Sequence, residues 1–123
     1  MTMFCRGVRG ATTVDANTKE AIVEATRELL DRLVEANDLD PADVGSIFFT
    51  ATPDLDAEFP AVAARDLGLQ RVPLLCTREV PVPGSLPRVI RVLLHYYAPE
   101  DHEPRHVYLG EARALRADLE SAQ

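Results

Sequence analysis

Arg91 is the side chain that most needs a chemical explanation, because it stands inside the apolar run VIRVLL (89–94). β-Branched and aliphatic residues at this density favour a buried strand over a solvated loop, although apolar periodicity alone leaves a helix open. An arginine keeps its proton inside a protein, so a buried one needs an anionic partner or a ligand. Arg91 could therefore pair with an acidic residue such as Glu79 and only hold a sheet together, or it could face a bound anion.

A second arginine stands beside small residues that would leave room for a ligand. In RGVRGATTV (6–14), an extended chain places Arg9 on the same face as Gly7 and Ala11. Neither neighbour has a side chain large enough to fill the space beside the guanidinium. The competing interpretation is a solvated strand arginine, with glycines that permit a β-bulge.

The stretch CTRE (76–79) places polar and charged side chains at the end of a predicted strand. Cys76, Arg78 and Glu79 come just before PVPGSLP (81–87), a loop stiffened by three prolines. Side chains at such a junction can be directed into a cleft. The alternative is a polar strand end with no function.

Two apparent motifs do not predict a site. HEPRH (102–106) matches the zinc-protease pattern H-E-x-x-H in letters, but that pattern needs a helix to bring both histidines to one face. Pro104 stands inside it and would break the helix, so we predict no metal site. Cys5 and Cys76 lie far apart in the sequence and predict neither a disulfide framework nor a redox motif.

The overall composition limits the kinds of partner. The chain has 123 residues, a formal net charge of −7 and a pI near 4.9. Nucleic acids and anionic membranes attract proteins with a positive field, so we expect neither as a partner. A small anion would need arginines gathered locally against this field. The N-terminal residues lack the apolar core of a signal peptide, and no stretch has the length of a membrane span, which predicts a cytoplasmic protein.

The elements that must position these residues predict a single α+β domain over residues 1–123. The expected strands are 4–14, 46–52, 71–80, 88–97 and 105–110. The expected helices are 16–37 and 59–68, with a helical turn at 40–44, and the tail at 111–123 is a candidate mobile segment. One long and one short helix cannot cover both faces of a five-stranded mixed sheet, so another subunit is the simplest cover for the second face.

The long helix carries the clearest periodic pattern. Its apolar residues recur at steps of three and four and form one stripe: Ile22, Thr26, Leu29, Leu30, Leu33 and Val34. Asn17 and Glu20 have the spacing of a capping box at its start. Asn37 is suited to a left-handed conformation at its end.

Four stretches together resemble one known family. RGVRGATTV (6–14), FTATPDLDAEFPAVAAR (49–65), VPLLCTREVPVPGSLPRVIRV (72–92) and RHVYLGEARALRADL (105–119) are similar, in this order and with closely matching spacing, to the AroH-type chorismate mutases. These are the trimeric class that is not all-helical. The resemblance implies a mixed sheet with helices, a homotrimeric pseudo-barrel and active sites between subunits. It also implies the rearrangement of chorismate to prephenate in phenylalanine and tyrosine biosynthesis, with no cofactor and no metal.

The resemblance also implies roles for individual residues. Arg91 is expected against the ether oxygen of the substrate, Glu79 against its ring hydroxyl, and Arg9 against a carboxylate. The implied substrate-binding residues are Leu75, Cys76, Thr77, Arg78 and Tyr108, of which Tyr108 shares the carboxylate with Arg9. The implied peripheral residues are Phe59, Ala61, Arg65 and Leu115.

Two positions depart from the family pattern. Val62 stands where some members carry a lysine, which predicts weaker capture of the substrate. Ala117 stands where a proline is frequent, in a tail that is thought to close over the site. This departure bears on how well the tail is ordered over the site.

The implied reaction fits the residue types. A [3,3] rearrangement breaks a C–O bond while a C–C bond forms, so it needs no nucleophile, general base, metal or cofactor. It gains from holding the flexible arm over the ring and from stabilising the negative charge that develops on the ether oxygen. The alternative is a catalytically inactive trimer of the same fold that binds or senses a small molecule.

Overall fold

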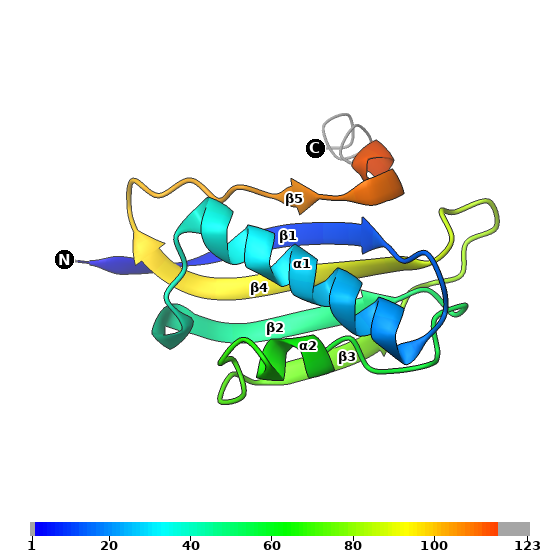
Figure 1. The fold of residues 1–123 in the computed structure, drawn as a ribbon. Helices are drawn as coiled ribbons and strands as arrows, with labels where there is room; N and C mark the ends of the chain where they lie inside the picture. Colours follow the sequence, from blue (N-terminus) through cyan, green and yellow to red (C-terminus); the bar gives the residue numbers. More distant parts are fainter. Residues whose placement is uncertain (1, 116–123) are drawn as a thin grey trace.

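The structure is a computed structural model that describes residues 2–115 (Figure 1). The strands are β1 (Met3–Thr13), β2 (Val44–Ala51), β3 (Leu74–Arg78), β4 (Val89–Pro99) and β5 (Val107–Tyr108). The α-helices are α1 (Lys19–Asn37) and α2 (Val62–Arg65), and the 3₁₀ turns are η1 (Pro41–Asp43) and η2 (Gly110–Ala112). The predicted α+β class with a five-stranded sheet is confirmed.

The sheet has the order β3-β2-β4-β1-β5 and is mixed. The central strand β4 runs antiparallel to both of its neighbours, β2 and β1. The outer strands β3 and β5 each run parallel to the strand beside them. Strands from both ends of the chain therefore meet in one sheet, which brings residues that are distant in sequence side by side.

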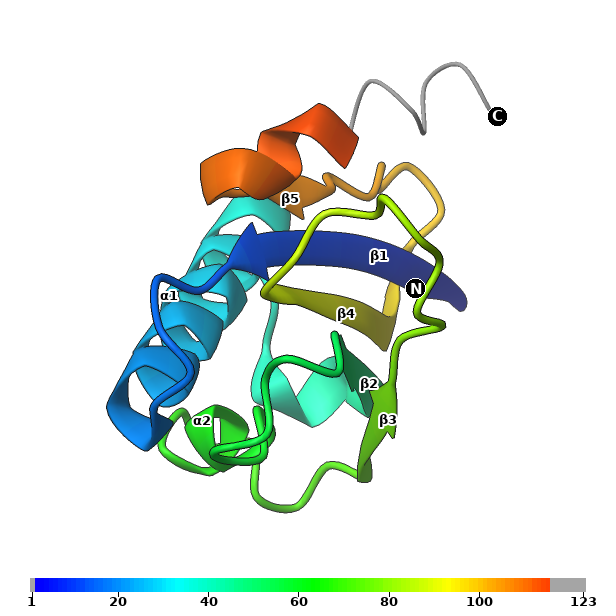
Figure 2. The same ribbon diagram turned by 90° about the vertical axis from the view of Figure 1, so that its right-hand side faces the viewer.

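Both helices lie on the same face of the sheet (Figures 1 and 2). The predicted stripe of α1 is confirmed, because Leu29, Leu30 and Leu33 are fully buried against strand residues such as Phe49 and Leu94. Within the described part of the chain, no helix combines the length and the apolar character that a membrane crossing requires. The opposite face of the sheet carries no helix of the described residues (Figure 2).

The strand β4 confirms the strand interpretation of the apolar run around Arg91. Its side chains alternate in burial from Val92 onward, as a strand with one covered face requires. Leu94 and Tyr96 are buried beneath α1, whereas Leu93 and Tyr97 are exposed on the opposite face. Arg91 lies on that opposite face, so the expectation that the isolated chain buries it is wrong.

Three elements are shorter than the sequence predicts. α2 has 4 residues instead of the expected 59–68, because the turns around it are held by bonds such as Ala63 N–H to Pro60 O at 3.0 Å, which join residues three apart. β3 begins after Pro73, whose ring nitrogen cannot donate to a ladder. β5 has only 2 residues, since the Arg9 N–H beside its start donates to the His106 ring instead of to a strand carbonyl.

Both predicted caps of the long helix are wrong by one residue. Thr18 is the N-cap and accepts the Ala21 N–H at 3.1 Å. Asn17 instead binds the segment after β2, accepting the Asp56 N–H at 3.0 Å. At the other end Asp38 takes the left-handed conformation, and Asn37 stays in the helix, where its amide donates to the carbonyl of Arg105 at 3.0 Å. Both asparagines thus hold tertiary contacts that local spacing does not reveal.

Candidate active site

One row of side chains crosses the open face of the sheet from edge to edge. The strand register pairs Thr77 of β3 with Thr50 of β2, and Thr50 with Arg91 of β4. Arg91 in turn pairs with Ala11 of β1, and Ala11 with Tyr108 of β5. Because side chains at paired positions point to the same face, these five residues are neighbours.

A cavity of about 300 Å³ lies over this row. It is lined by Arg9, Gly10, Ala11, Phe48, Thr50, Thr77, Glu79, Arg91, Val92, Leu93 and Tyr108. Two arginines and one glutamate therefore face a space whose remaining wall is largely apolar. Such a space suits a small anionic molecule, since polar groups fix its orientation and apolar groups exclude water.

Arg91 and Glu79 form an ion pair at the cavity. The Arg91 Nε lies 2.9 Å from the Glu79 Oε1, and the two side chains are 46% and 21% exposed. The same Oε1 accepts the hydroxyl of Thr50 at 2.5 Å. The pair that the sequence offered as one interpretation of Arg91 thus exists, and it lies where it can also contact a ligand.

Arg9 reaches the cavity from β1, on the face that its spacing predicts. Gly7 shares this face, since a side chain there would meet Leu93 and His95 at 3.8 Å. The Arg9 main chain donates its N–H to the His106 Nδ1 at 3.0 Å. The imidazole therefore takes the place of a strand carbonyl on the side of β1 that faces β5.

Gly10 explains how β1 can lie close enough to α1. A Cβ at this position would come within 2.9 Å of the Leu33 Cδ1 and 3.0 Å of the Leu29 Cδ1. Only a residue without a side chain permits this approach of strand and helix. The glycine beside Arg9 thus serves helix packing on one face while Arg9 faces the cavity on the other.

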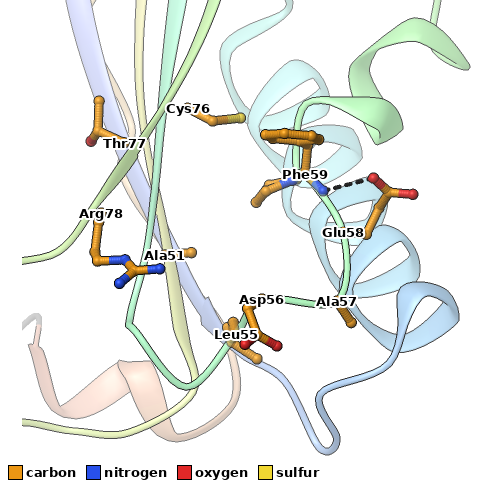
Figure 3. Close-up of a pocket in the computed structure, with 10 residues that line it drawn as sticks. Ala51, Leu55, Asp56, Ala57, Glu58, Phe59, Cys76, Thr77 and Arg78 are labelled. Atoms are coloured by element: carbon orange, nitrogen blue, oxygen red, sulfur yellow. Dashed lines mark hydrogen bonds between the residues drawn. The ribbon is translucent and has the colours of Figure 1, made fainter.

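A second cavity, of about 360 Å³, lies between β3 and the segment 55–60 (Figure 3). It is lined by Ala51, Leu55, Asp56, Ala57, Glu58, Phe59, Pro60, Cys76, Thr77 and Arg78. Figure 3 shows the Cys76 side chain pointing toward the Phe59 ring across this space. Phe59 is 67% exposed, so its ring is accessible to a ligand or to another chain.

The chemical state of Cys76 follows from its surroundings. Burial raises the pKa of its thiol above the usual value, while a backbone hydrogen bond at Ala61 and the charge of Arg65 act in the opposite direction. The thiol is therefore protonated at neutral pH. A protonated thiol is a weak hydrogen-bond donor and a poor nucleophile, so Cys76 suits a packing role.

The structure divides the predicted site residues between these two cavities. Arg9, Glu79, Arg91 and Tyr108 line the first, Phe59, Cys76 and Arg78 line the second, and Thr77 lines both. Ala61 and Arg65 lie beside Cys76. Leu75 lies in neither cavity and is exposed on the open face beside Phe48, its partner in the register. Leu115, partly buried, is the last described residue and lines neither cavity.

Thr50 and Phe48 line the first cavity and were not among the residues that the sequence singled out. A period-two signal was available, because alternation along the predicted strand 46–52 places both residues on one face. His106 was also missed, since it was considered only as part of the zinc-like pattern. In the structure the two histidines of that pattern serve different neighbours: His102 Nε2 bonds the Tyr96 hydroxyl at 2.6 Å, and His106 accepts the Arg9 N–H.

Within residues 2–115, no group of three or more His, Cys, Asp and Glu side chains is arranged to hold a metal ion. The fold and the first cavity define an α+β protein whose sheet carries an ion pair and a second arginine at one cavity. The comparisons with known proteins agree with this class. A family model described as chorismate mutase type I matches residues 5–119, and the chain belongs to this family of isomerases.

Individual relatives match over almost their whole length. The chain is 58% identical to chorismate mutase AroH of Thermus thermophilus over 121 residues, which is 96% of this chain and 98% of the relative. It is 46% identical to chorismate mutase AroH of Bacillus subtilis (strain 168), over 95% of this chain and 94% of the relative. A solved structure of a chorismate mutase from Clostridium thermocellum matches with a TM-score of 0.86 and 46% identity, covering 89% of this chain and 98% of that one.

Proposed function

We propose that this chain catalyses the rearrangement of chorismate to prephenate in phenylalanine and tyrosine biosynthesis. The observation that carries the proposal is the cavity at which Arg9, Glu79 and Arg91 converge on an otherwise apolar wall, in a chain of the chorismate mutase family. Charges in this arrangement complement a dicarboxylate that also carries a hydroxyl. The net charge of −7 disfavours binding to a nucleic acid or an anionic membrane. We expect the enzyme to act in the cytoplasm.

The proposed roles follow the distribution of charge in the reaction. As the C–O bond lengthens, negative charge develops on the ether oxygen, and the Arg91 guanidinium is the cation that stabilises it. Arg9 and Tyr108 bind a carboxylate of the substrate, and the Glu79 carboxylate accepts a hydrogen bond from the ring hydroxyl. No proton leaves or enters the substrate, so every residue acts by position and charge. Once a neighbouring chain covers the cavity, its apolar wall excludes water and lets these charges act with little screening.

We propose a homotrimer in which each site is shared by two chains. The open face of the sheet exposes a row of apolar side chains in register, in which Phe48 is 38%, Leu75 52% and Leu93 38% exposed. Contiguous exposed apolar residues mark an interaction surface, and a second copy is the partner that the family resemblance suggests. The second cavity, with Phe59 and Cys76, would then close the first cavity of the neighbouring chain.

The test of the function is the loss of the chorismate diene absorbance on addition of purified protein, with prephenate identified as the product. We expect turnover that chelators do not reduce and that changes little with pH around neutrality, because no group exchanges a proton with the substrate. Binding of chorismate without turnover would instead identify an inactive ligand-binding protein of this fold. A sharp bell-shaped pH profile of the chemical step would contradict the proposed mechanism, since it would indicate acid–base catalysis.

A further inference from the structure

Thr50 contacts the one carboxylate of the first cavity, although no catalytic role follows from its residue type. It lies near the end of β2, in the row between Thr77 and Arg91. Its hydroxyl donates to the Glu79 Oε1 at 2.5 Å, and the Arg91 Nε lies 2.9 Å from the same oxygen. We propose that Thr50 is a positioning residue for the rearrangement, which fixes the Glu79 carboxylate so that its other oxygen receives the substrate hydroxyl.

The two contacts give the two oxygens of the carboxylate different roles, because both use Oε1. Thr50 and Arg91 both use Oε1, and among residues 2–115 no hydrogen bond or ion pair uses Oε2. A carboxylate oxygen has two lone pairs, so two donors leave Oε1 little capacity for a third. Because Glu79 lines the cavity, Oε2 is the acceptor that a bound ligand can reach.

The second donor also limits rotation of the carboxylate. A single bond from Arg91 would allow the group to turn about its last torsion, which has a broad energy minimum. The Thr50 hydroxyl approaches from the sheet. The Glu79 main chain is fixed as well, because its N–H donates a hydrogen bond to the Ala51 carbonyl at 2.9 Å. With the backbone and one oxygen fixed, the position of the second oxygen is determined before the substrate arrives. Such preorganisation lowers the barrier without a cost of reorientation during the reaction.

A purely structural role for Thr50 is the competing explanation, because threonine is common in strands and its loss could simply weaken the sheet. The two explanations differ in what they predict for the folded protein. A structural residue changes the melting temperature and leaves the turnover of the folded fraction intact. A positioning residue changes turnover and acts only while Glu79 is present.

The experiment compares Thr50→Val, which keeps the shape and removes the hydroxyl, with Thr50→Ser, which keeps the hydroxyl. The wild-type diene assay comes first, since the inference rests on the proposed function. We expect Thr50→Val to lower kcat/KM about tenfold, the size expected for one hydrogen bond to a charged group, and Thr50→Ser to stay within about threefold of wild type. Thr12→Val is the matched control. Thr12 is buried in β1, and among residues 2–115 its hydroxyl donates only to the neighbouring Thr13 carbonyl at 3.3 Å, so removal of this hydroxyl should leave turnover unchanged.

A double-mutant cycle with Glu79→Ala decides between the two explanations. If Thr50 acts through Glu79, Thr50→Val should cost less than about twofold when Glu79 is already alanine. An equal cost in both backgrounds, or full turnover of a folded Thr50→Val enzyme, would overturn the proposal. Should Thr50→Val fail to fold, Thr50→Ala replaces it in the cycle. If the wild-type protein has no turnover, the proposed function fails by itself. Crystal structures of wild type and Thr50→Val then test whether the Glu79 carboxylate changes its orientation when the hydroxyl is absent.

Discussion

The ion pair between Arg91 and Glu79 contributes little to folding in a single chain, because both side chains are partly exposed, at 46% and 21%. Exposed pairs stabilise proteins by only about 0–1 kcal/mol, whereas breaking a buried pair costs about 3–5 kcal/mol. The sequence suggested the buried case, and the isolated chain has the exposed one. The contribution of Arg91 to folding is therefore small, and its proposed role at the ether oxygen explains better why an arginine stands at this position.

Arg91→Ala should accordingly separate stability from activity. We expect the melting temperature to change little, and turnover to fall by roughly 10²–10³, the usual effect of losing one preorganised donor to a developing oxyanion. Arg91→Lys should not restore turnover, since its ammonium is a point charge on a flexible stem and cannot bind two groups as the guanidinium fork does. Melting curves and single-turnover rates are measured on the same samples. A destabilised variant whose folded fraction turns over normally would contradict the catalytic role.

The two cysteines should differ in their reaction with iodoacetamide. Cys5 is exposed, whereas burial raises the pKa of the Cys76 thiol above its ordinary value of 9.0. Since the thiolate is the reactive form, Cys5 should be alkylated first at pH 8, and Cys76 should react only as the pH rises further. Peptide mass mapping over a series of pH values measures both rates. Rapid alkylation of Cys76 at neutral pH would show instead that it is a thiolate.

The raised pKa of Cys76 also has a consequence for stability. Between 9.0 and the raised value, the unfolded chain has lost this proton and the folded chain has kept it. The folded state then binds more protons, so the free energy of unfolding falls as the pH rises through this window. Below pH 9 the thiol is protonated in both states, and Cys76 adds no pH dependence.

At the scale of elements, the sequence predicts those features that depend on local pattern. The strand predicted from the apolar run around Arg91 and the apolar stripe of α1 are both present in the structure, because each element has one face against the same core. Predictions of features that depend on tertiary partners were wrong, or the features were missed. Asn17 leaves the cap position to bind the segment at Asp56, and β5 begins late because the His106 ring before it replaces a strand carbonyl. The role of Thr50 belongs to the same group, since nothing in the sequence shows that Glu79 of another segment lies above it.

Gly10→Ala tests how β1 is held against α1. The new methyl group would lie 2.9 Å from the Leu33 Cδ1, 3.0 Å from the Leu29 Cδ1 and 3.3 Å from the Val107 carbonyl oxygen. Overpacking of this kind typically costs about 1–3 kcal/mol, which urea unfolding can measure. Gly7→Ala is the matched control on the opposite face of the same strand, where the methyl group would meet its nearest neighbours at 3.8 Å. Equal stability of the two variants would show that the approach of strand and helix is not a constraint.

At the scale of the whole molecule, the two cavities would be complementary halves of one site in the proposed trimer. The first holds the charged residues Arg9, Glu79 and Arg91, and the second holds the exposed Phe59 and the neutral Cys76. Thr77, at the edge strand β3, lines both, so the two halves lie close to the sheet edge where another chain can approach. A ligand in the first cavity of one chain would gain an apolar cover from the second cavity of its neighbour. Catalysis should therefore depend on the proposed trimer. Light scattering and the diene assay, measured over the same dilution series, should show that activity is lost where the protein becomes monomeric.

Mixed trimers test the shared site directly. Arg91→Ala removes a residue of the first cavity, and Arg65→Glu reverses the charge beside Cys76 of the second. We expect each variant alone to be nearly inactive, since every site then contains one damaged half. Both variants are then unfolded and refolded together. A site is intact when the Arg65→Glu chain supplies its first cavity and the Arg91→Ala chain supplies its second cavity. For random mixing in equal amounts that chance is one half for each chain, so activity should return to about a quarter of wild type.

The control for this recovery uses two variants damaged in the same cavity. Arg91→Ala mixed with Arg9→Ala should stay inactive, because both residues line the first cavity and no chain then supplies an intact one. Native mass spectrometry of chains with different tags verifies that mixed trimers form in both experiments. If verified mixed trimers of Arg91→Ala and Arg65→Glu stay inactive, each site is contained in a single chain. The exposed Phe59 would then need another explanation, because the second cavity would not be the cover of a neighbour's site.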